Sequence, residues 1–302
     1  MNGEMLETIA CPLCESTRRR ELKFESQLII LAPGERIVRC RRCGFVYLNP
    51  RRSAGAVRSD WYDKEDYYTY YEQGIGAVGY QEGDAADHLK RRLREVESDF
   101  GRKGSLLDVG CGKGYFLAHA KKLGWSVQGV EVSAFAAQFA ARTHAVPVIN
   151  ATLEDAHLPP SAFDVIHMNH VLEHIYNLAP VLAEVRRVLS PGGVFVVEVP
   201  NQFAFLGYRL RKILLPSLLR RSKQGELNFH VSFFTKRTLV RLLRKHGFHP
   251  YRVQAKTWFP IASARGFLSR QIKHIIWKAE NRFEAGENLI VYARSEHHSL
   301  HR

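Results

Sequence analysis

From Gly104 onward, short apolar runs alternate along the chain with segments whose apolar residues recur at helical spacing. Such alternation is typical of a parallel sheet whose strands are joined by helical crossovers, so we predict a doubly wound α/β fold. The apolar runs predict seven strands, at Ser105–Val109, Ser126–Val130, Val146–Ile149, Asp164–Met168, Val194–Val199, Tyr251–Thr257 and Leu289–Ala293.

The polar and apolar positions between these runs predict helices, because their apolar residues fall on one face at a period of about 3.6 residues. The predicted helices are Asp87–Phe100, Tyr115–Leu123, Ala134–Thr143, Leu178–Leu189 and Thr235–His246. Helix and strand breakers mark the ends of these elements, since glycine and proline interrupt regular structure. The breakers are Gly124, Pro147, Pro159-Pro160, Pro191-Gly192-Gly193 and Gly247.

Four of the five cysteines form two CxxC pairs near the start of the chain, Cys11-Pro-Leu-Cys14 and Cys40-Arg-Arg-Cys43. Four thiolates in this pattern bind Zn²⁺ tetrahedrally and leave no coordination position open, which predicts a structural zinc site. Reduced, metal-binding thiols predict a reducing compartment. The chain begins without an apolar run of signal-peptide length, and no window approaches about 18 uninterrupted apolar residues, so we expect a cytoplasmic protein.

Composition divides the chain into three regions, and its 45% of hydrophobic residues is enough to form a sizeable core. We predict a zinc ribbon over residues 1–50 and an aromatic and helical linker or lid over 51–100. The tyrosine-rich run at 60–71 lies in that second region, where it serves as a lid or packs between the domains. The α/β domain covers 101–302 and carries basic amphipathic insertions near 205–225 and 262–285.

A glycine turn follows the first strand of the α/β domain, in the segment Leu106-Leu-Asp-Val-Gly-Cys-Gly-Lys-Gly114. A nucleoside ligand needs this turn free of side chains so that the backbone approaches closely. The second strand ends at Glu131, close to the spacing of about 20 residues at which an acidic side chain binds a ribose diol. The two features together predict a nucleoside-type cofactor.

Several motifs together resemble the class I S-adenosylmethionine-dependent methyltransferases. They are Asp108-Val-Gly-Cys-Gly-Lys-Gly114, Glu131, Phe163-Asp164-Val-Ile166, Leu172-Glu-His174 and Leu189-Ser-Pro-Gly-Gly193. The likeness is greatest to bacterial proteins that join an N-terminal zinc ribbon to a domain similar to the ubiquinone-type O-methyltransferases. The resemblance implies a Rossmann-like sheet, methyltransferase activity and S-adenosylmethionine as cofactor.

The resemblance also implies where each part of the cofactor binds. Asp108, Gly110 and Gly112 are expected around its methionine portion, and Glu131 at its ribose hydroxyls.

The adenine is expected in the loop after the third strand, capped by Leu153, Glu154 and Asp155, one of whose carboxylates receives the amino group. Asn169, at the end of the fourth strand, is expected to face the sulfonium.

The segment Asn169-His-Val-Leu-Glu-His174 admits three interpretations. His170, Glu173 and His174 match the HxxEH zinc-protease motif, although their position after the fourth strand of a glycine-loop fold opposes a protease. The corresponding segment of ubiquinone-type enzymes resembles ExxEH and holds a divalent cation, a pattern from which His170 departs. Without a metal, His170 is a candidate general base, with His230 as a second candidate. A structural alternative is that Glu173 and His174 cap the next helix and brace the loop.

The formal net charge of +14 favours an anionic partner. We therefore predict a methyltransferase acting on an anionic small molecule, sugar or glycan intermediate, at oxygen rather than nitrogen or carbon. An RNA methyltransferase is the alternative, because a zinc ribbon and basic segments also suit phosphate binding. A second alternative is a non-catalytic scaffold with a vestigial cofactor fold. The basic amphipathic segments also allow peripheral membrane contact.

Overall fold

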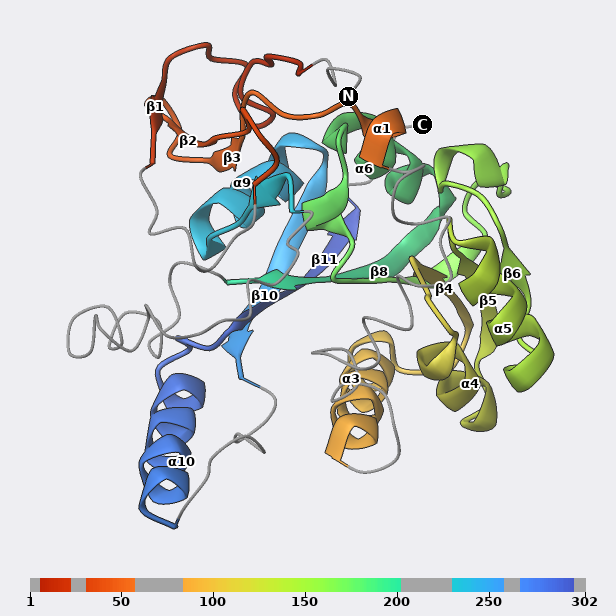
Figure 1. Ribbon diagram of the computed structural model, residues 1–302. Helices are drawn as coiled ribbons and strands as arrows, with labels where there is room; N and C mark the ends of the chain where they lie inside the picture. Colours follow the sequence, from red (N-terminus) through yellow and green to blue (C-terminus); the bar gives the residue numbers. More distant parts are fainter. Residues whose placement is uncertain (1–5, 23–30, 58–83, 202–229, 258–266, 296–302) are drawn as a thin grey trace, which may run out of the picture.

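A computed structural model describes residues 6–22, 31–57, 84–201, 230–257 and 267–295 of the chain. Its centre is a seven-stranded sheet with the strand order β10-β11-β8-β7-β4-β5-β6 (Figure 1). The strands are β4 (Ser105–Val109), β5 (Ser126–Val130), β6 (Val148–Ile149), β7 (Phe163–Asn169), β8 (Leu189–Pro200), β10 (Phe248–Lys256) and β11 (Asn288–Ser295). The predicted α/β fold class is confirmed.

Five neighbouring strands, from β8 through β7, β4 and β5 to β6, run parallel, whereas β11 pairs antiparallel with both β8 and β10. The carboxyl ends of the parallel strands therefore meet at one edge of the sheet, where ligands bind in open α/β folds. The glycine turn after β4, Glu131 after β5 and His170 after β7 all leave the sheet at this edge.

Helices cover both faces of the sheet (Figure 1). On one face, α3 (Asp84–Phe100), α4 (Tyr115–Lys122) and α5 (Ala134–His144) pack on an apolar cluster that includes Leu93, Leu106 and Val196. On the other face, α6 (Leu178–Val188) and α9 (Lys236–Lys245) enclose the larger cluster around Leu107, Val185 and Leu242. Each helix predicted from periodicity is present, with ends that differ by at most a few residues.

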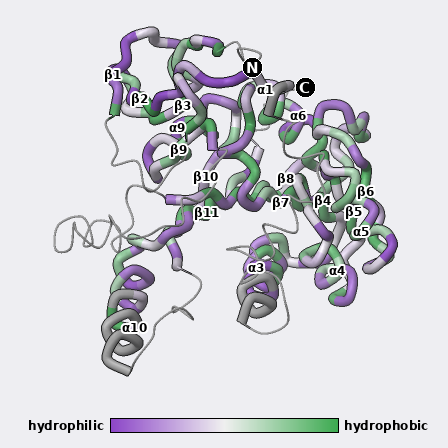
Figure 2. Tube along the Cα trace, viewed as in Figure 1, coloured by the Kyte–Doolittle hydropathy of each residue, from purple (hydrophilic) through white to green (hydrophobic). Residues whose placement is uncertain are grey.

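The helices α6 and α9 that cover the sheet are amphipathic, with their buried residues on one face, and Figure 2 shows hydrophilic and hydrophobic residues mixed along the helices. The helix α10 (Phe267–Arg282) occupies part of the predicted second basic segment and extends away from the sheet in Figure 1. No helix in the described ranges has both the length and the apolar character needed to cross a membrane. The tyrosine-rich run at 60–71 and the basic insertion at 205–225 fall outside the described residues.

The prediction that Pro191-Gly192-Gly193 ends an element is wrong, because β8 runs through these residues as a bulge. Phe163 pairs with Leu189 and Val165 with Val194. The stretch of β8 between Leu189 and Val194 therefore lies opposite a single residue of β7, Asp164. A Cβ on Gly193 would lie 2.9 Å from the carbonyl oxygen of Asp164. Glycine therefore permits the close approach of β7 here, and the chain continues as a strand.

A second, four-stranded sheet contains β1 (Arg19–Glu21), β2 (Ile37–Cys40), β3 (Val46–Leu48) and β9 (Ser232–Phe233), in that order. All its pairings are antiparallel. Three strands come from the cysteine-containing N-terminal region, whereas β9 comes from the chain between β8 and α9. Phe45, just before β3, packs on Phe234, just after β9, with ring centroids 5.5 Å apart. The N-terminal sheet is thus completed by a strand from the α/β part of the chain.

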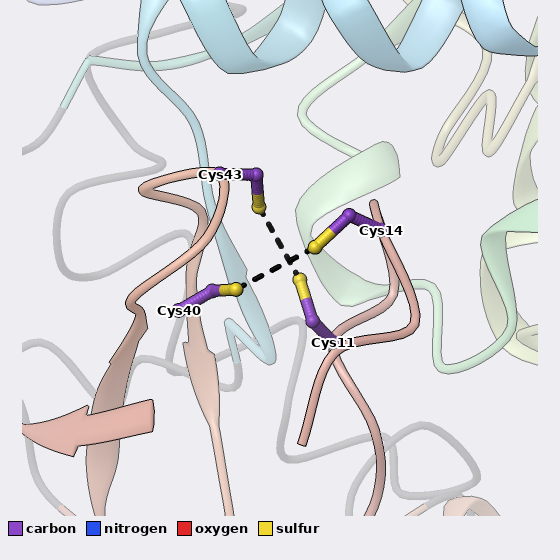
Figure 3. A group of neighbouring side chains, drawn as sticks. All are labelled: Cys11, Cys14, Cys40 and Cys43. Atoms are coloured by element: carbon purple, nitrogen blue, oxygen red, sulfur yellow. Dashed lines mark hydrogen bonds between the residues drawn. The ribbon is translucent and has the colours of Figure 1, made fainter. Parts of the chain in front are cut away.

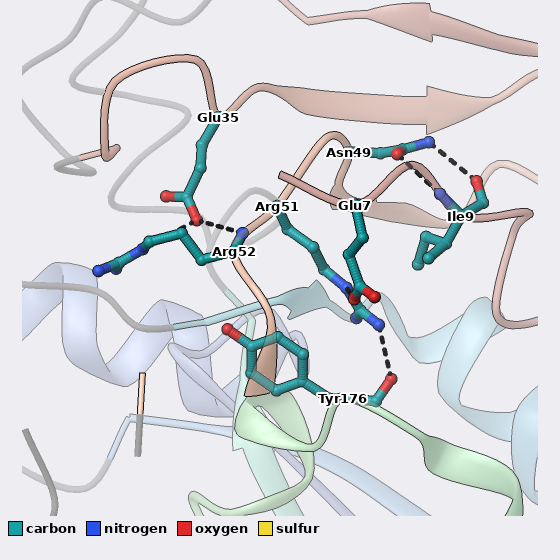
Figure 4. Close-up of polar contacts among 7 residues, drawn as sticks. All are labelled: Glu7, Ile9, Glu35, Asn49, Arg51, Arg52 and Tyr176. Carbon is teal, nitrogen blue, oxygen red and sulfur yellow. Dashed lines mark hydrogen bonds and ion pairs between the residues drawn. The ribbon is translucent and has the colours of Figure 1, made fainter. Parts of the chain in front are cut away.

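Polar contacts strengthen this junction (Figure 4). Arg51 donates from Nη2 to the carbonyl oxygen of Tyr176 at 3.2 Å and lies over the Tyr176 ring, 4.5 Å from its centroid. Asn49 exchanges two hydrogen bonds with the backbone of Ile9, which anchors the start of the chain to the same region. The division into residues 1–50, 51–100 and 101–302 remains a prediction.

Candidate cofactor and catalytic site

The four predicted zinc ligands converge in the structure (Figure 3). Cys11 Sγ lies 3.5 Å from Cys43 Sγ, and Cys14 Sγ lies 3.5 Å from Cys40 Sγ. All four sulfur atoms lie within 4.8 Å of one another. Tetrahedral zinc with bonds of about 2.3 Å requires sulfur–sulfur separations of about 3.8 Å, so this donor set fits the ion closely.

The electrostatics of the cluster also suit a bound cation. Burial raises the pKa of Cys43 to about 11, although a backbone hydrogen bond from Phe45 opposes the shift. A buried thiol of this kind loses its proton only when positive charge compensates the thiolate. Zinc would supply that charge and hold the two CxxC loops together, as structural zinc does in small domains that have little core.

The glycine turn after β4 has the shape that a closely approaching ligand needs. Gly110 has a φ of 69°, and a Cβ at this position would lie 2.4 Å from Cγ2 of Val171. At Gly112, with a φ of 52°, an added Cβ would meet nothing within 4 Å. The turn therefore packs tightly against the loop after β7 on one side and leaves open space beside Gly112 on the other.

Glu131 ties the end of β5 to this turn. Its Oε2 accepts a hydrogen bond from the Gly112 amide at 2.8 Å, and its Oε1 accepts one from the Ser133 amide at 2.9 Å. The residue is only 5% exposed, and a carboxylate has further lone pairs with which to accept hydrogen bonds from ribose hydroxyls. Asn150, which sequence reasoning missed, donates to the carbonyl oxygens of Glu131 and Val132 and so holds β6 to the end of β5.

The predicted adenine-capping residues lie in the turn after β6, at η3 (Glu154–Ala156). Leu153 is buried and precedes the turn, whereas Glu154 and Asp155 are exposed. Asp155 accepts a hydrogen bond from the Thr152 hydroxyl at 2.7 Å, and its own amide donates to that hydroxyl at 3.2 Å. These bonds fix the turn locally, so Asp155 has a structural role in addition to any contact with adenine.

Cys111, the cysteine within the glycine turn, has no features of a nucleophile. The residue is 8% exposed, and its burial together with the nearby charges of Asp108 and Glu131 raises the pKa of its thiol. A buried thiol with a raised pKa stays protonated and unreactive at neutral pH.

Asn169 ends β7 opposite Glu198 of β8, and His170 follows it in a left-handed conformation with a φ of 54°. The His170 amide donates to the carbonyl oxygen of Glu198 at 2.9 Å. A non-glycine residue in this conformation costs free energy and is enriched at functional sites. The side chain of His170 is 38% exposed, which leaves it accessible from solvent.

Glu173 lies beneath His170 in the short helix η4 (Leu172–His174), with only 1% of the residue exposed. Its Oε1 is 3.3 Å from His170 Nδ1 and 3.8 Å from His230 Nε2. The rings of His174 and His230 meet edge to face, with centroids 4.7 Å apart. The tertiary structure therefore brings both predicted base candidates to one buried carboxylate.

This arrangement shifts the pKa values of His170 and His230 in opposite directions. Burial lowers the pKa of His230 to about 3, assisted by the nearby charge of His174, so its imidazole is neutral at physiological pH. Burial also works against the charged form of His170, but its hydrogen bond with Glu173 and the charges of Glu173 and Glu198 outweigh burial and raise its pKa. The pKa of Glu173 is lowered, because its close contact with His170 and the nearby charge of His174 outweigh its burial.

Glu173, His174 and His230 also have the composition of a cation site, since their donor atoms lie within 4.8 Å of one another. His170, rather than the glutamate of the ExxEH pattern, stands beside them.

A family model described as a methyltransferase domain matches residues 80–253, which include the glycine turn, Glu131 and the His170–His174 segment. The chain belongs to the class I S-adenosylmethionine-dependent methyltransferase family. The predicted family is thus confirmed. The open space beside Gly112 and the acceptor oxygens of Glu131 are compatible with this cofactor.

Curated relatives are similar to parts of this chain. A probable S-adenosylmethionine-dependent methyltransferase of Mycolicibacterium smegmatis is 35% identical over 101 residues, which are 33% of this chain and 39% of that protein. The chain thus spans well under half of that relative. A ubiquinone biosynthesis O-methyltransferase of Thiobacillus denitrificans is 29% identical over 178 residues, which are 56% of this chain and 75% of that protein.

Solved structures agree on the fold. A Burkholderia thailandensis 1,6-didemethyltoxoflavin-N1-methyltransferase with bound 1,6-didemethyltoxoflavin and S-adenosylhomocysteine aligns with a TM-score of 0.54 at 17% identity. The alignment covers 89% of this chain and 98% of that one. A methyltransferase from Archaeoglobus fulgidus aligns with a TM-score of 0.51 at 20% identity, over 75% of this chain and 98% of that chain.

Replacement of one cluster cysteine should prevent the four-cysteine site from holding zinc. We expect Cys11→Ser to reduce bound zinc from about one ion per chain to well under half, and to lower Tm, because metal binding and ribbon folding are coupled. Inductively coupled plasma mass spectrometry measures the zinc. The control is Cys111→Ser, which should retain the ion, and equal zinc content in both variants would contradict the assignment.

Neutralising Glu131 should weaken cofactor binding. Glu131→Gln removes a charged acceptor that also holds the Gly112 amide, so we expect a loss of about 1–3 kcal/mol in S-adenosylhomocysteine affinity by calorimetric titration. The control is Glu184→Gln in helix α6, away from the glycine turn, which should bind S-adenosylhomocysteine as the parent does. Unchanged affinity in Glu131→Gln would remove this residue from the cofactor site.

Proposed function

We propose that this protein transfers a methyl group from S-adenosylmethionine to a hydroxyl of a small molecule, sugar or glycan intermediate, with His170 as the general base. The observation that carries the proposal is the pairing of a half-exposed histidine with a buried carboxylate at the carboxyl edge of the sheet. His170 Nδ1 lies 3.3 Å from Glu173 Oε1, and the carboxylate is almost wholly removed from solvent.

S-adenosylmethionine, when bound, supplies an electrophilic methyl group on a sulfonium. The chain's part is to make the acceptor oxygen nucleophilic. With the proton of its imidazole on Nδ1, facing Glu173, His170 has a lone pair on Nε2 with which to take the acceptor's hydroxyl proton. Glu173 then stabilises the imidazolium, as a carboxylate does when it orients a catalytic histidine.

His230 remains the second candidate base, but two observations support His170. His230 is only 9% exposed, so an acceptor reaches it less readily. Its pKa of about 3 also makes it a weak base, because general bases are most effective when their pKa lies near the working pH. We assign to His230 the role of a neutral neighbour that lies against Glu173 from the side of β9.

The oxygen acceptor is supported by the ubiquinone biosynthesis relative, whose name states O-methylation. An anionic acceptor is supported by the net charge of +14, since a positive field raises the local concentration of anions. Calorimetric titration with S-adenosylmethionine comes first, and absence of binding would favour a scaffold. A screen of nucleotide-linked sugars, glycans and RNA with a tritiated methyl donor then identifies the acceptor class, and labelling of RNA alone would refute the proposal.

Removal of the base should affect turnover and not cofactor binding. We expect His170→Ala to lower kcat about 10²–10⁴-fold, the usual contribution of a general base, while the Kd for S-adenosylhomocysteine stays near that of the parent. The exposed His249→Ala on β10 is the matched control and should retain full activity. Parent-like turnover in His170→Ala would end the base assignment.

The pH dependence follows from the direction of the His170 shift. A base must be neutral, and Glu173 raises the pKa of His170, so activity should rise with pH through a value above the ordinary 6.5. In Glu173→Gln the main upward contribution is lost, and the acid limb should move to lower pH. Steady-state rates between pH 5 and 9 test this, and an unmoved limb would contradict the pairing.

The proposed histidine base requires no cation at Glu173, His174 and His230. We therefore expect one zinc per chain, at the cysteine cluster, and turnover that survives brief treatment with EDTA. Loss of activity that returns with Mg²⁺, at unchanged zinc content, would replace the histidine base by a metal-assisted mechanism.

A further inference from the structure

Arg92 belongs to helix α3 and is almost fully buried, with 2% of the residue exposed. Its neighbours on the same helix, Leu93 and Val96, enter the apolar cluster that fills this face of the sheet. A guanidinium is rarely buried unless it is paired, because removing a charge from water is costly. The side chains that pair with Arg92 therefore indicate its role in the structure.

Two adjacent strands supply those partners, and a third supplies the next side chain in the line. Arg92 Nη2 contacts the carboxylate of Glu198 on β8, and Nη1 lies 3.1 Å from Nε2 of His167 on β7. His167 Nδ1 in turn lies 2.7 Å from Oδ1 of Asp108 on β4. A guanidinium only donates, so His167 Nε2 accepts. The ring therefore carries its hydrogen on Nδ1 and donates it to Asp108.

This line of four side chains is enclosed. Asp108 is 4% exposed, His167 2% and Glu198 1%. The ring of Phe116, from α4, stacks on His167 with centroids 4.1 Å apart and an interplanar angle of 30°. The imidazole is thus held by a hydrogen bond at each nitrogen and by an aromatic ring on one face, which fixes the orientation in which it meets Asp108.

Both ends of the line reach the proposed site. Asp108 immediately precedes Val109 and the glycine turn, and Glu198 Oε1 lies 4.0 Å from His170 Nε2. Arg92 is therefore placed between the cofactor strand and the proposed base, although it comes from a helix outside the sheet. None of the residues that the sequence predicted to bind the cofactor lies in helix α3.

We propose that Arg92 is a positioning residue for the cofactor: through His167 it fixes the orientation of the Asp108 carboxylate. This inference rests on the proposed function only in taking Asp108 as a cofactor-binding residue. By reciprocity, a bound cofactor that uses this orientation of Asp108 stabilises the contact between Arg92 and His167.

The test uses S-adenosylhomocysteine, which needs no acceptor and no base. We expect Arg92→Met to raise its Kd roughly tenfold or more, the effect of disturbing a charged hydrogen-bond partner. Leu93→Ala is the matched control: it removes a neighbouring buried contact of the same helix and lowers Tm, but it leaves the four polar side chains intact. Its Kd should stay within about twofold of the parent, measured well below both melting temperatures. Equal affinities in the two variants would overturn the proposal.

Variants of His167 keep the proposal testable if Arg92→Met does not fold. His167→Phe preserves a ring against Phe116 but removes both hydrogen bonds, and it should weaken S-adenosylhomocysteine binding. His167→Gln retains one donor and one acceptor and should restore part of that affinity. Nitrogen-15 NMR of the imidazole should show the hydrogen on Nδ1 in the parent. Parent-like affinity in His167→Phe, or a hydrogen on Nε2, would refute the proposed orientation.

Failure of this inference is distinguishable from failure of the proposed function. His170→Ala tests the base and leaves S-adenosylhomocysteine binding unchanged, whereas the Arg92 and His167 variants are judged by that binding alone.

Discussion

The carboxyl edge of the sheet contains charged groups that folding has removed from water, and their compensation governs the rest of the site. Asp108, Glu173 and Glu198 are each less than 5% exposed. Buried carboxylates are tolerated only with charged or hydrogen-bonding partners, which here are His167, His170 and Arg92. Because each partner comes from a different element, the edge forms only when β4, β7, β8 and α3 are assembled.

A parallel sheet makes this concentration of charge structurally feasible. Its strands are apolar on both faces along most of their length, and polar residues occur where the strands leave the core. Val194 and Val196 of β8 are fully buried before the chain reaches Glu198, and Val165 of β7 precedes His167 in the same way. The apolar part supplies stability, whereas the few polar positions at the edge provide the chemistry.

The N-terminal ribbon contributes to the same site through backbone pairing. Strand β3 pairs with β9, and the amide of Val231, just before β9, donates to the carbonyl oxygen of Glu173 at 2.9 Å. His230 is the residue before Val231, so its approach to Glu173 depends on where β9 is held. The cysteine cluster lies at the other end of the same small sheet.

Local sequence determined most of the secondary structure and identified the candidate cofactor-binding residues. Periodicity located the strands of the main sheet and its helices, since it reflects which side chains face the core. Glycines and a carboxylate at strand ends identified the turn at Gly112 and the role expected of Glu131. Helical spacing even places Arg92 on the stripe of Leu89 and Val96, a signal that the neighbouring basic residues conceal. Only the tertiary structure decided that β9 completes the ribbon, that Glu173 joins His170 to His230, and that Arg92 pairs with Glu198. These contacts join residues far apart in the chain, and a pattern confined to one segment carries no information about which distant partner compensates a buried charge.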